Sequence, residues 1–270
     1  MLGDAVRVGH RVLRVARDGI DKVRSDGRTD HPFLVRVRDP RGDVVDLRAR
    51  AVVDASGTWG QPNPLGASGL PALGEERLGA HVVGPLPDVL GRDRARFAGR
   101  RTLVVGAGHS AANTLTALAQ LAEREPGTQV LWAIRRSTPL AVFGGGAADA
   151  LPARGRLGVG LRELVTSGAV ELVPGFAVTE LEGDGDAVTV VGRTADGERR
   201  LAGVSTVVAA TGFRPDLSTL SEVRLDLDPG LEAPARLAPL IDPELHSCGT
   251  VPRTGTASSP SRRTGCTSSG

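Results

Sequence analysis

The chain has 270 residues, 40% of them hydrophobic and 24% charged, enough for one large or two ordinary domains. It contains no apolar run of about 18 residues, and its net charge of +2 is too small to indicate nucleic-acid binding. The first ten residues hold no apolar export signal and the two cysteines lack CxxC spacing, so we expect a soluble cytoplasmic protein without a redox dithiol or a cysteine-rich zinc site.

Segments of alternating apolar and polar residues open the chain. They lie at Val6–Ala16, Phe33–Asp39 and Val44–Arg50, with turn-forming residues between them. This pattern predicts an antiparallel β-meander. The meander runs directly into Ala51–Gly57, which we predict to be an apolar strand that stops on small residues. The Gly- and Pro-rich stretch 66–100 has little periodicity and is expected to be a connection.

The stretch Arg101–Glu123 has the pattern of a strand, a tight turn and a helix. A short apolar run ends at Gly106 and Gly108, and Ala111 stands where a third glycine is usual in a GxGxxG turn. Glycines there let the backbone approach a diphosphate, which the free N–H groups of the helix's first turn can bind. A purely structural glycine turn is the alternative. The apolar stripe along the helix favours dinucleotide binding.

The residues after the next strand indicate which dinucleotide is bound. That strand is predicted at Gln129–Ile134, and an NAD-preferring site would carry an Asp or Glu at its end. This chain has Arg135 and Arg136 instead, and guanidinium groups pair well with a 2′-phosphate. A solvated arginine pair is the alternative, because Lys22 is the only lysine and arginine is the default cation. The missing acid and the arginines together favour NADP(H).

The second half of the chain repeats the order of elements found in the first half. A helix is predicted at Leu157–Ser167 and a short strand at Val170–Val173. A second meander is predicted at Phe176–Leu181, Ala187–Val191 and Glu198–Leu201. A strand at Val204–Ala210 follows it and again stops on small residues. Residues 52–58 and 207–213 share one motif, which predicts two related nucleotide-binding units; two ordinary strands ending in turns are the alternative.

The motifs together resemble a known group of flavoproteins. The motifs are an Ala-Ser-Gly strand end, a GxGxSA turn, an arginine after the second strand and the closing ATGFRPD of residues 210–216. They are typical of FAD-dependent pyridine nucleotide oxidoreductases with two dinucleotide-binding domains, and among these they most resemble flavin-containing monooxygenases. The resemblance covers about residues 5–250. It implies an α/β fold, with a Rossmann-type NADP-binding domain carrying a β-meander and an incomplete FAD domain made of a meander and a strand. It also implies that NADPH reduces FAD, which then activates oxygen.

The resemblance assigns residues to both cofactors. NADPH would be held by Gly106, Gly108, His109, Ser110, Ala111, Arg135 and Arg136. FAD would lie near Ser56, Gly57 and Thr58, and the junction of the two sites near Thr211 and Gly212. The cofactors supply the chemistry, so no side chain is assigned a catalytic role and no metal is expected.

The same resemblance divides the chain into parts. We expect a partial FAD domain over 1–100, an NADP-binding domain over 101–216, a partial return to the FAD domain over 217–252 and a disordered tail over 253–270. The glycine turn that holds FAD in the group has no counterpart here, so we expect a chain truncated at both ends. Three functions stay open, for an unidentified small substrate: an NADPH-dependent flavin monooxygenase, a flavin-linked NAD(P)H reductase, and an inactive fragment that only binds NADP.

Overall fold

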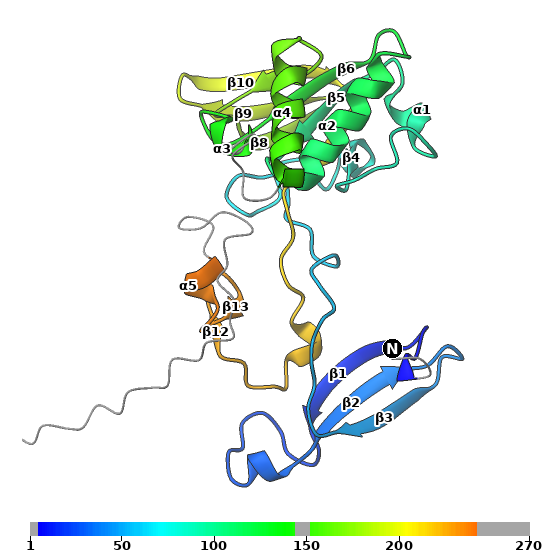
Figure 1. The fold of residues 1–270 in the computed structure, drawn as a ribbon, viewed down its shortest axis with the longest axis vertical. Coiled ribbons are helices and arrows are strands. Elements are labelled where there is room, and N and C mark those ends of the chain that lie inside the picture. Colours follow the sequence, from blue (N-terminus) through cyan, green and yellow to red (C-terminus); the bar gives the residue numbers. More distant parts are fainter. Residues whose placement is uncertain (1–4, 144–151, 242–270) are drawn as a thin grey trace, which may run out of the picture. The chain divides into compact units, whose positions relative to one another are not determined.

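The computed structural model describes residues 5–143 and 152–241 and divides the chain into two units, 1–224 and 225–270 (Figure 1). The first unit begins with an antiparallel sheet of β1 (Arg11–Arg17), β2 (Phe33–Arg38) and β3 (Val44–Ala49), in that order. This confirms the first predicted meander. A short 3-10 helix, Arg28–Asp30, lies between β1 and β2.

The first meander has a small core. Within its strands only Val15 and Val37 are buried apolar side chains. A cross-strand pair supports the exposed face: the Arg36 guanidinium donates to the directly opposite Asp46 carboxylate at 2.8 Å. This hydrogen bond holds the pKa of Asp46 below its usual value.

The later part of the first unit is built on a five-stranded parallel sheet in the order β4-β11-β5-β6-β7. Its strands are β4 (Val82–Val83), β5 (Arg101–Val105), β6 (Gln129–Ala133), β7 (Glu171–Val173) and β11 (Thr206–Ala209). Strand β5 lies between β11 and β6, at the centre. The sheet confirms the predicted α/β class, with the Rossmann-type strand, turn and helix at its middle.

Two different layers cover the two faces of this sheet (Figure 1). Helices α2 (His109–Ala122) and α4 (Pro152–Thr166) cover one face. A second meander of β8 (Ala177–Asp184), β9 (Ala187–Thr194) and β10 (Gly197–Val204) covers the other. Because side chains alternate along a strand, each central strand contributes to both cores. Leu103 and Val105 pack towards the meander, whereas Val104 packs towards the helices.

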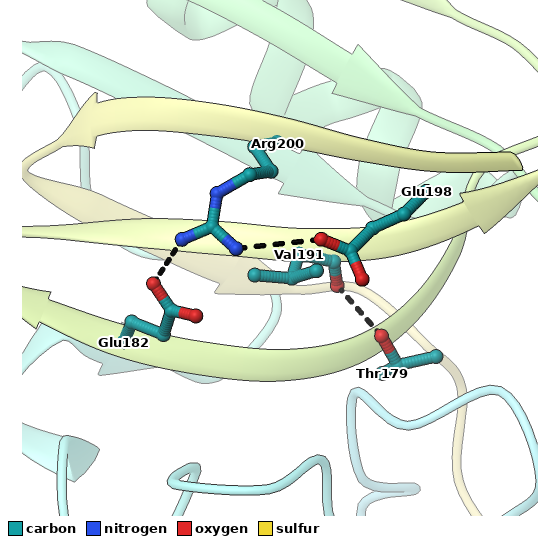
Figure 2. Close-up of polar contacts among 5 residues, drawn as sticks. All are labelled: Thr179, Glu182, Val191, Glu198 and Arg200. Carbon is teal, nitrogen blue, oxygen red and sulfur yellow. Dashed lines mark hydrogen bonds and ion pairs between the residues drawn. The ribbon is translucent and has the colours of Figure 1, made fainter.

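Polar contacts close the outer face of the second meander, as Figure 2 shows. Arg200 on β10 donates to Glu182 on β8, and also to Glu198 at 3.4 Å. Beside this pair, the Thr179 hydroxyl donates to the Val191 carbonyl at 3.3 Å. Val191 lies on the middle strand and is only 2% exposed. The middle strand is therefore buried on both faces.

The structure corrects two predictions in the first hundred residues. Ala51–Gly57 forms no strand: all seven residues are exposed, and none of the described strands pairs with them. Residues 66–100 are not simply a connection. They contain β4, the 3-10 helix Gly79–His81 and helix α1 (Arg94–Phe97). Strand β4 has two residues, too few to show a period, and forms by pairing with β11.

The remaining elements are short. Helix α3 (Leu140–Phe143) precedes α4, and a 3-10 helix lies at Ser218–Leu220. The second unit contains the antiparallel pair β12 (Leu227–Asp228) and β13 (Ala233–Pro234), followed by helix α5 (Ala238–Ile241). Residues 144–146, the tail predicted at 253–270 and both cysteines lie outside the described residues. None of the helices within residues 5–143 and 152–241 has the length and apolarity needed to cross a membrane.

Candidate functional site

The turn between β5 and α2 requires glycine at its first position. Gly106 has a φ of +132°, which side chains rarely adopt. A Cβ atom there would lie 2.1 Å from the carbonyl oxygen of Ala210, the residue after β11. The ends of β5 and β11 therefore approach each other too closely for any residue but glycine.

Gly108 has a different role, because it faces open space. It is the residue before α2, in extended conformation, and a Cβ atom there would meet no atom within 4 Å. Ala107, Gly108 and His109 are all exposed. Among the described residues no side chain caps the helix, so the N–H groups of its first turn are available to an anion. Ala111 is 1% exposed, as expected where a helix packs closely on the sheet.

Arg135 and Arg136 lie at the same edge of the sheet as this turn. They follow β6, which pairs in parallel with β5, with Ala133 opposite Val105. Both side chains are exposed, and within the described residues neither forms an ion pair with a carboxylate. Arg135 donates to the carbonyl of Ala67 at 3.3 Å. Two exposed positive charges thus lie at the sheet edge at which α2 begins.

Thr211 and Gly212 follow β11 and are tied to an earlier segment. The Thr211 hydroxyl donates to the Asn63 carbonyl at 2.6 Å, and the Asn63 N–H donates to the Gly212 carbonyl at 2.9 Å. The rings of Trp59 and Phe213 are 5.1 Å apart beside these bonds. The segments around Asn63 and Gly212 are thus hydrogen-bonded to each other. Thr211 also directly follows Ala210, whose carbonyl lies against the glycine turn.

Ser56, Gly57 and Thr58 are not brought to the glycine turn by any hydrogen bond within the described residues. The Ser56 N–H donates to the Asp54 carboxylate at 2.9 Å. Hydrogen bonds from Ser56, first from its side chain, lower the pKa of Asp54. Ser56 and Gly57 are exposed. The segment is a local turn, and its predicted relation to FAD stays a prediction.

The site contains residues that sequence motifs do not reveal. The indole of Trp132 donates to the Gly106 carbonyl, Asn63 pairs with Thr211, and Glu75 binds the backbone of the loop that contacts Arg135. Of these three residues, only Trp132 could have been indicated by the sequence. Side chains alternate between the two faces of β6, and this alternation places Trp132 on the face covered by the helix that follows the turn.

No protein-family model and no curated protein matches the sequence. Solved structures do match. Bacillithiol disulfide reductase from Bacillus cereus aligns with a TM-score of 0.59 and 20% identity, over 82% of this chain and 55% of its own. The FAD-bound cadaverine monooxygenase DfoA from Erwinia amylovora gives 0.57 and 18%, over 83% and 57%.

An engineered enzyme gives a third match. It is a water-forming NADPH oxidase made from the NADH oxidase of Lactobacillus brevis and bound to NADPH. It aligns with a TM-score of 0.52 and 20% identity, over 82% of this chain and 40% of its own. Its five substitutions replace an aspartate with alanine and introduce two arginines.

The chain spans little more than half the length of the first two of these proteins. The structural neighbours are FAD-dependent pyridine nucleotide oxidoreductases and flavin monooxygenases, the group predicted from the sequence motifs. The chain has the fold of the flavoproteins in that group.

Proposed function

We propose that the chain supplies the NADP(H) site of an NADPH-dependent, FAD-containing oxidoreductase of the flavin monooxygenase type. One observation carries this proposal: an open glycine turn and two arginines that have no carboxylate partner within residues 5–143 and 152–241 lie at the same edge of the parallel sheet. Ligands of such sheets bind at the carboxyl ends of the strands.

The residues present fit the cofactor's phosphates. The amides after Gly106, with His109, Ser110 and Ala111 in the first turn of α2, would bind the diphosphate where Gly108 leaves space. Arg135 and Arg136 would bind the 2′-phosphate, which an acidic residue at this position would repel. The protein's part is to bind and orient the dinucleotide, which supplies a hydride when bound.

The flavin part of the proposal rests on the resemblance. The DfoA structure is bound to FAD, which supports FAD as a cofactor here. Its place next to Ser56, Gly57 and Thr58, with Thr211 and Gly212 at the junction, is part of the proposal. Residues 51–57 form no strand and are all exposed. We therefore assign no step to FAD within this chain. The predicted division of the chain into domains, with boundaries at residues 100, 216 and 252, is part of the same proposal.

The test is a titration of the purified full-length chain with NADP⁺ and with NAD⁺, followed by tryptophan fluorescence and melting temperature. We expect NADP⁺ to change the emission of buried Trp132 and to raise the melting temperature at saturation, since a ligand stabilises the state that binds it. NAD⁺ should need a higher concentration for the same effect. No response to either dinucleotide would contradict the proposal.

A flavin-linked NAD(P)H reductase is the second candidate, because a disulfide reductase is among the structural neighbours. Hydrogen peroxide released during NADPH oxidation without an acceptor substrate would favour the monooxygenase type. NADPH oxidation that depends on an added electron acceptor would favour the reductase. A purified protein without flavin absorbance that still binds NADP⁺ would indicate a module that only binds the dinucleotide.

A further inference from the structure

A loop far from Arg135 in the sequence holds its side chain. Arg135 is exposed at the end of β6, and an exposed arginine samples many rotamers unless something fixes it. Here its guanidinium donates to the carbonyl oxygen of Ala67, at 3.3 Å. A guanidinium has five N–H donors, so this bond leaves others free to pair with a phosphate.

The Ala67 carbonyl can orient Arg135 because the peptide group that precedes it in the loop is hydrogen-bonded to the second meander. The Ala67 N–H donates to the Val178 carbonyl on β8 at 3.1 Å. Further along the same loop, Leu73 exchanges backbone hydrogen bonds with β8, to Thr179 at 3.0 Å and from Leu181 at 2.7 Å. The loop 65–75 is therefore attached to the second meander.

The Glu75 carboxylate closes this loop at both ends. It accepts hydrogen bonds from the Leu65 N–H, at 3.0 and 3.2 Å, and from the Ala72 N–H, at 2.7 Å. Leu65 and Ala72 are 3% and 5% exposed and belong to the core under the sheet. One carboxylate thus accepts hydrogen bonds from two backbone N–H groups that the loop would otherwise leave unpaired. One of these groups lies two residues before Ala67 and the other five residues after it.

We propose that Glu75 is a positioning residue that sets the preference for the phosphorylated dinucleotide. It closes the loop so that the Ala67 carbonyl holds Arg135 in place before the ligand arrives. This inference rests on the proposed function, in which Arg135 binds the 2′-phosphate. Fixing one long side chain in advance is worth about 0.5–1.5 kcal/mol in binding, which corresponds to a change in affinity of about 2- to 12-fold.

The test compares dissociation constants for NADP⁺ and NAD⁺ in the full-length chain and in Glu75→Gln. A glutamine side chain is neutral and offers one acceptor oxygen in place of two, with an NH₂ group beside the backbone donors, so the hydrogen bonds that close the loop are weakened. We expect the preference for NADP⁺ over NAD⁺ to fall about 2- to 12-fold. Glu76→Gln is the matched control: it removes the same charge from an exposed neighbour and should leave the preference unchanged.

A double-mutant cycle separates positioning from a general structural role. If Glu75 acts through Arg135, Glu75→Gln should have no further effect on the preference in an Arg135→Ala background. An unchanged preference in Glu75→Gln, including an equal loss for both dinucleotides, would overturn the inference. So would the same loss in both backgrounds.

Two further outcomes complete the test. If Glu75→Gln fails to fold, Glu75→Asp retains the charge and withdraws the carboxylate by one methylene, and an unchanged preference in that variant overturns the inference equally. A wild-type chain that does not prefer NADP⁺ would remove the proposed function and this inference together. A wild-type preference that survives the Glu75 substitution removes only the inference.

Discussion

The indole nitrogen of Trp132 donates a hydrogen bond to the carbonyl oxygen of Gly106 at 2.7 Å. Trp132 lies on β6 and has no exposed surface, and Gly106 begins the turn after β5. The buried indole ring thereby fixes the Gly106 carbonyl of the turn. The carbonyl of Gly106 cannot rotate without breaking this bond, so the amide groups of the turn keep their direction.

Trp132→Phe tests this relationship. The variant leaves the Gly106 carbonyl without its donor, which should lower the free energy of unfolding by about 1–3 kcal/mol. Affinities for NADP⁺ and NAD⁺ should fall by the same factor, because the turn contacts only what the two share. Urea denaturation and titration measure the two effects. Trp59→Phe, at a position 69% exposed, is the control and should change neither.

Gly106→Ala and Gly108→Ala should separate folding from binding. A methyl group at Gly106 meets the Ala210 oxygen and the residue needs a positive φ, so we expect a loss of at least about 1–3 kcal/mol of stability. A methyl group at Gly108 meets no protein atom, so stability should change by less than about 1 kcal/mol. Binding of both dinucleotides to Gly108→Ala should nevertheless weaken about tenfold. Equal effects of the two variants on stability would contradict this assignment.

Arg135→Asp combined with Arg136→Ala should change dinucleotide selectivity. Charge-assisted hydrogen bonds are worth about 1.5–3 kcal/mol, so we expect NADP⁺ affinity to fall about 10- to 150-fold while NAD⁺ affinity changes little. Isothermal titration with each dinucleotide measures both. Arg124→Asp, in the turn that follows α2, is the charge control; it changes the net charge by two units, against three in the double variant. Equal losses for the two dinucleotides would refute contact with the 2′-phosphate.

Thr102→Val should stabilise the chain. The Thr102 hydroxyl on β5 is fully buried and has no hydrogen-bond partner among the described residues. Valine has nearly the same shape without the unpaired group, so the free energy of unfolding should rise by about 1 kcal/mol. Thr116→Val provides the contrast, because the Thr116 hydroxyl donates to the Ala112 carbonyl at 3.0 Å. A loss of stability in Thr102→Val would mean that the hydroxyl has a partner in solution.

Local patterns sufficed for elements whose partners are close in sequence or whose period is clear. Both meanders, the turn at Gly106 and the helix after it were predictable, because alternation, turn residues and helical spacing act over a few residues. The segment Ala51–Gly57 has the composition of a buried strand but forms none, because a strand needs a neighbour to pair with and composition does not supply one.

The candidate site was only partly predictable for the same reason. Gly106, Gly108 and the arginines belong to a motif with fixed spacing, so they could be named from sequence. Glu75 and Asn63 act on backbone groups of distant or irregular segments, and no motif marks them. A two-residue strand such as β4 is likewise defined by β11, more than a hundred residues later.

The pairing of Asn63 with Thr211 and Gly212 has a consequence for how this sequence is assembled. The chain enters the part that contains the parallel sheet near Pro62 and leaves it near Phe213, and these two residues form a β-bridge. A body with adjacent ends can be grafted into a host loop without forcing the host's own ends apart. The segment of about 150 residues between these points thus has adjacent ends, which is the geometry of a domain inserted into another domain.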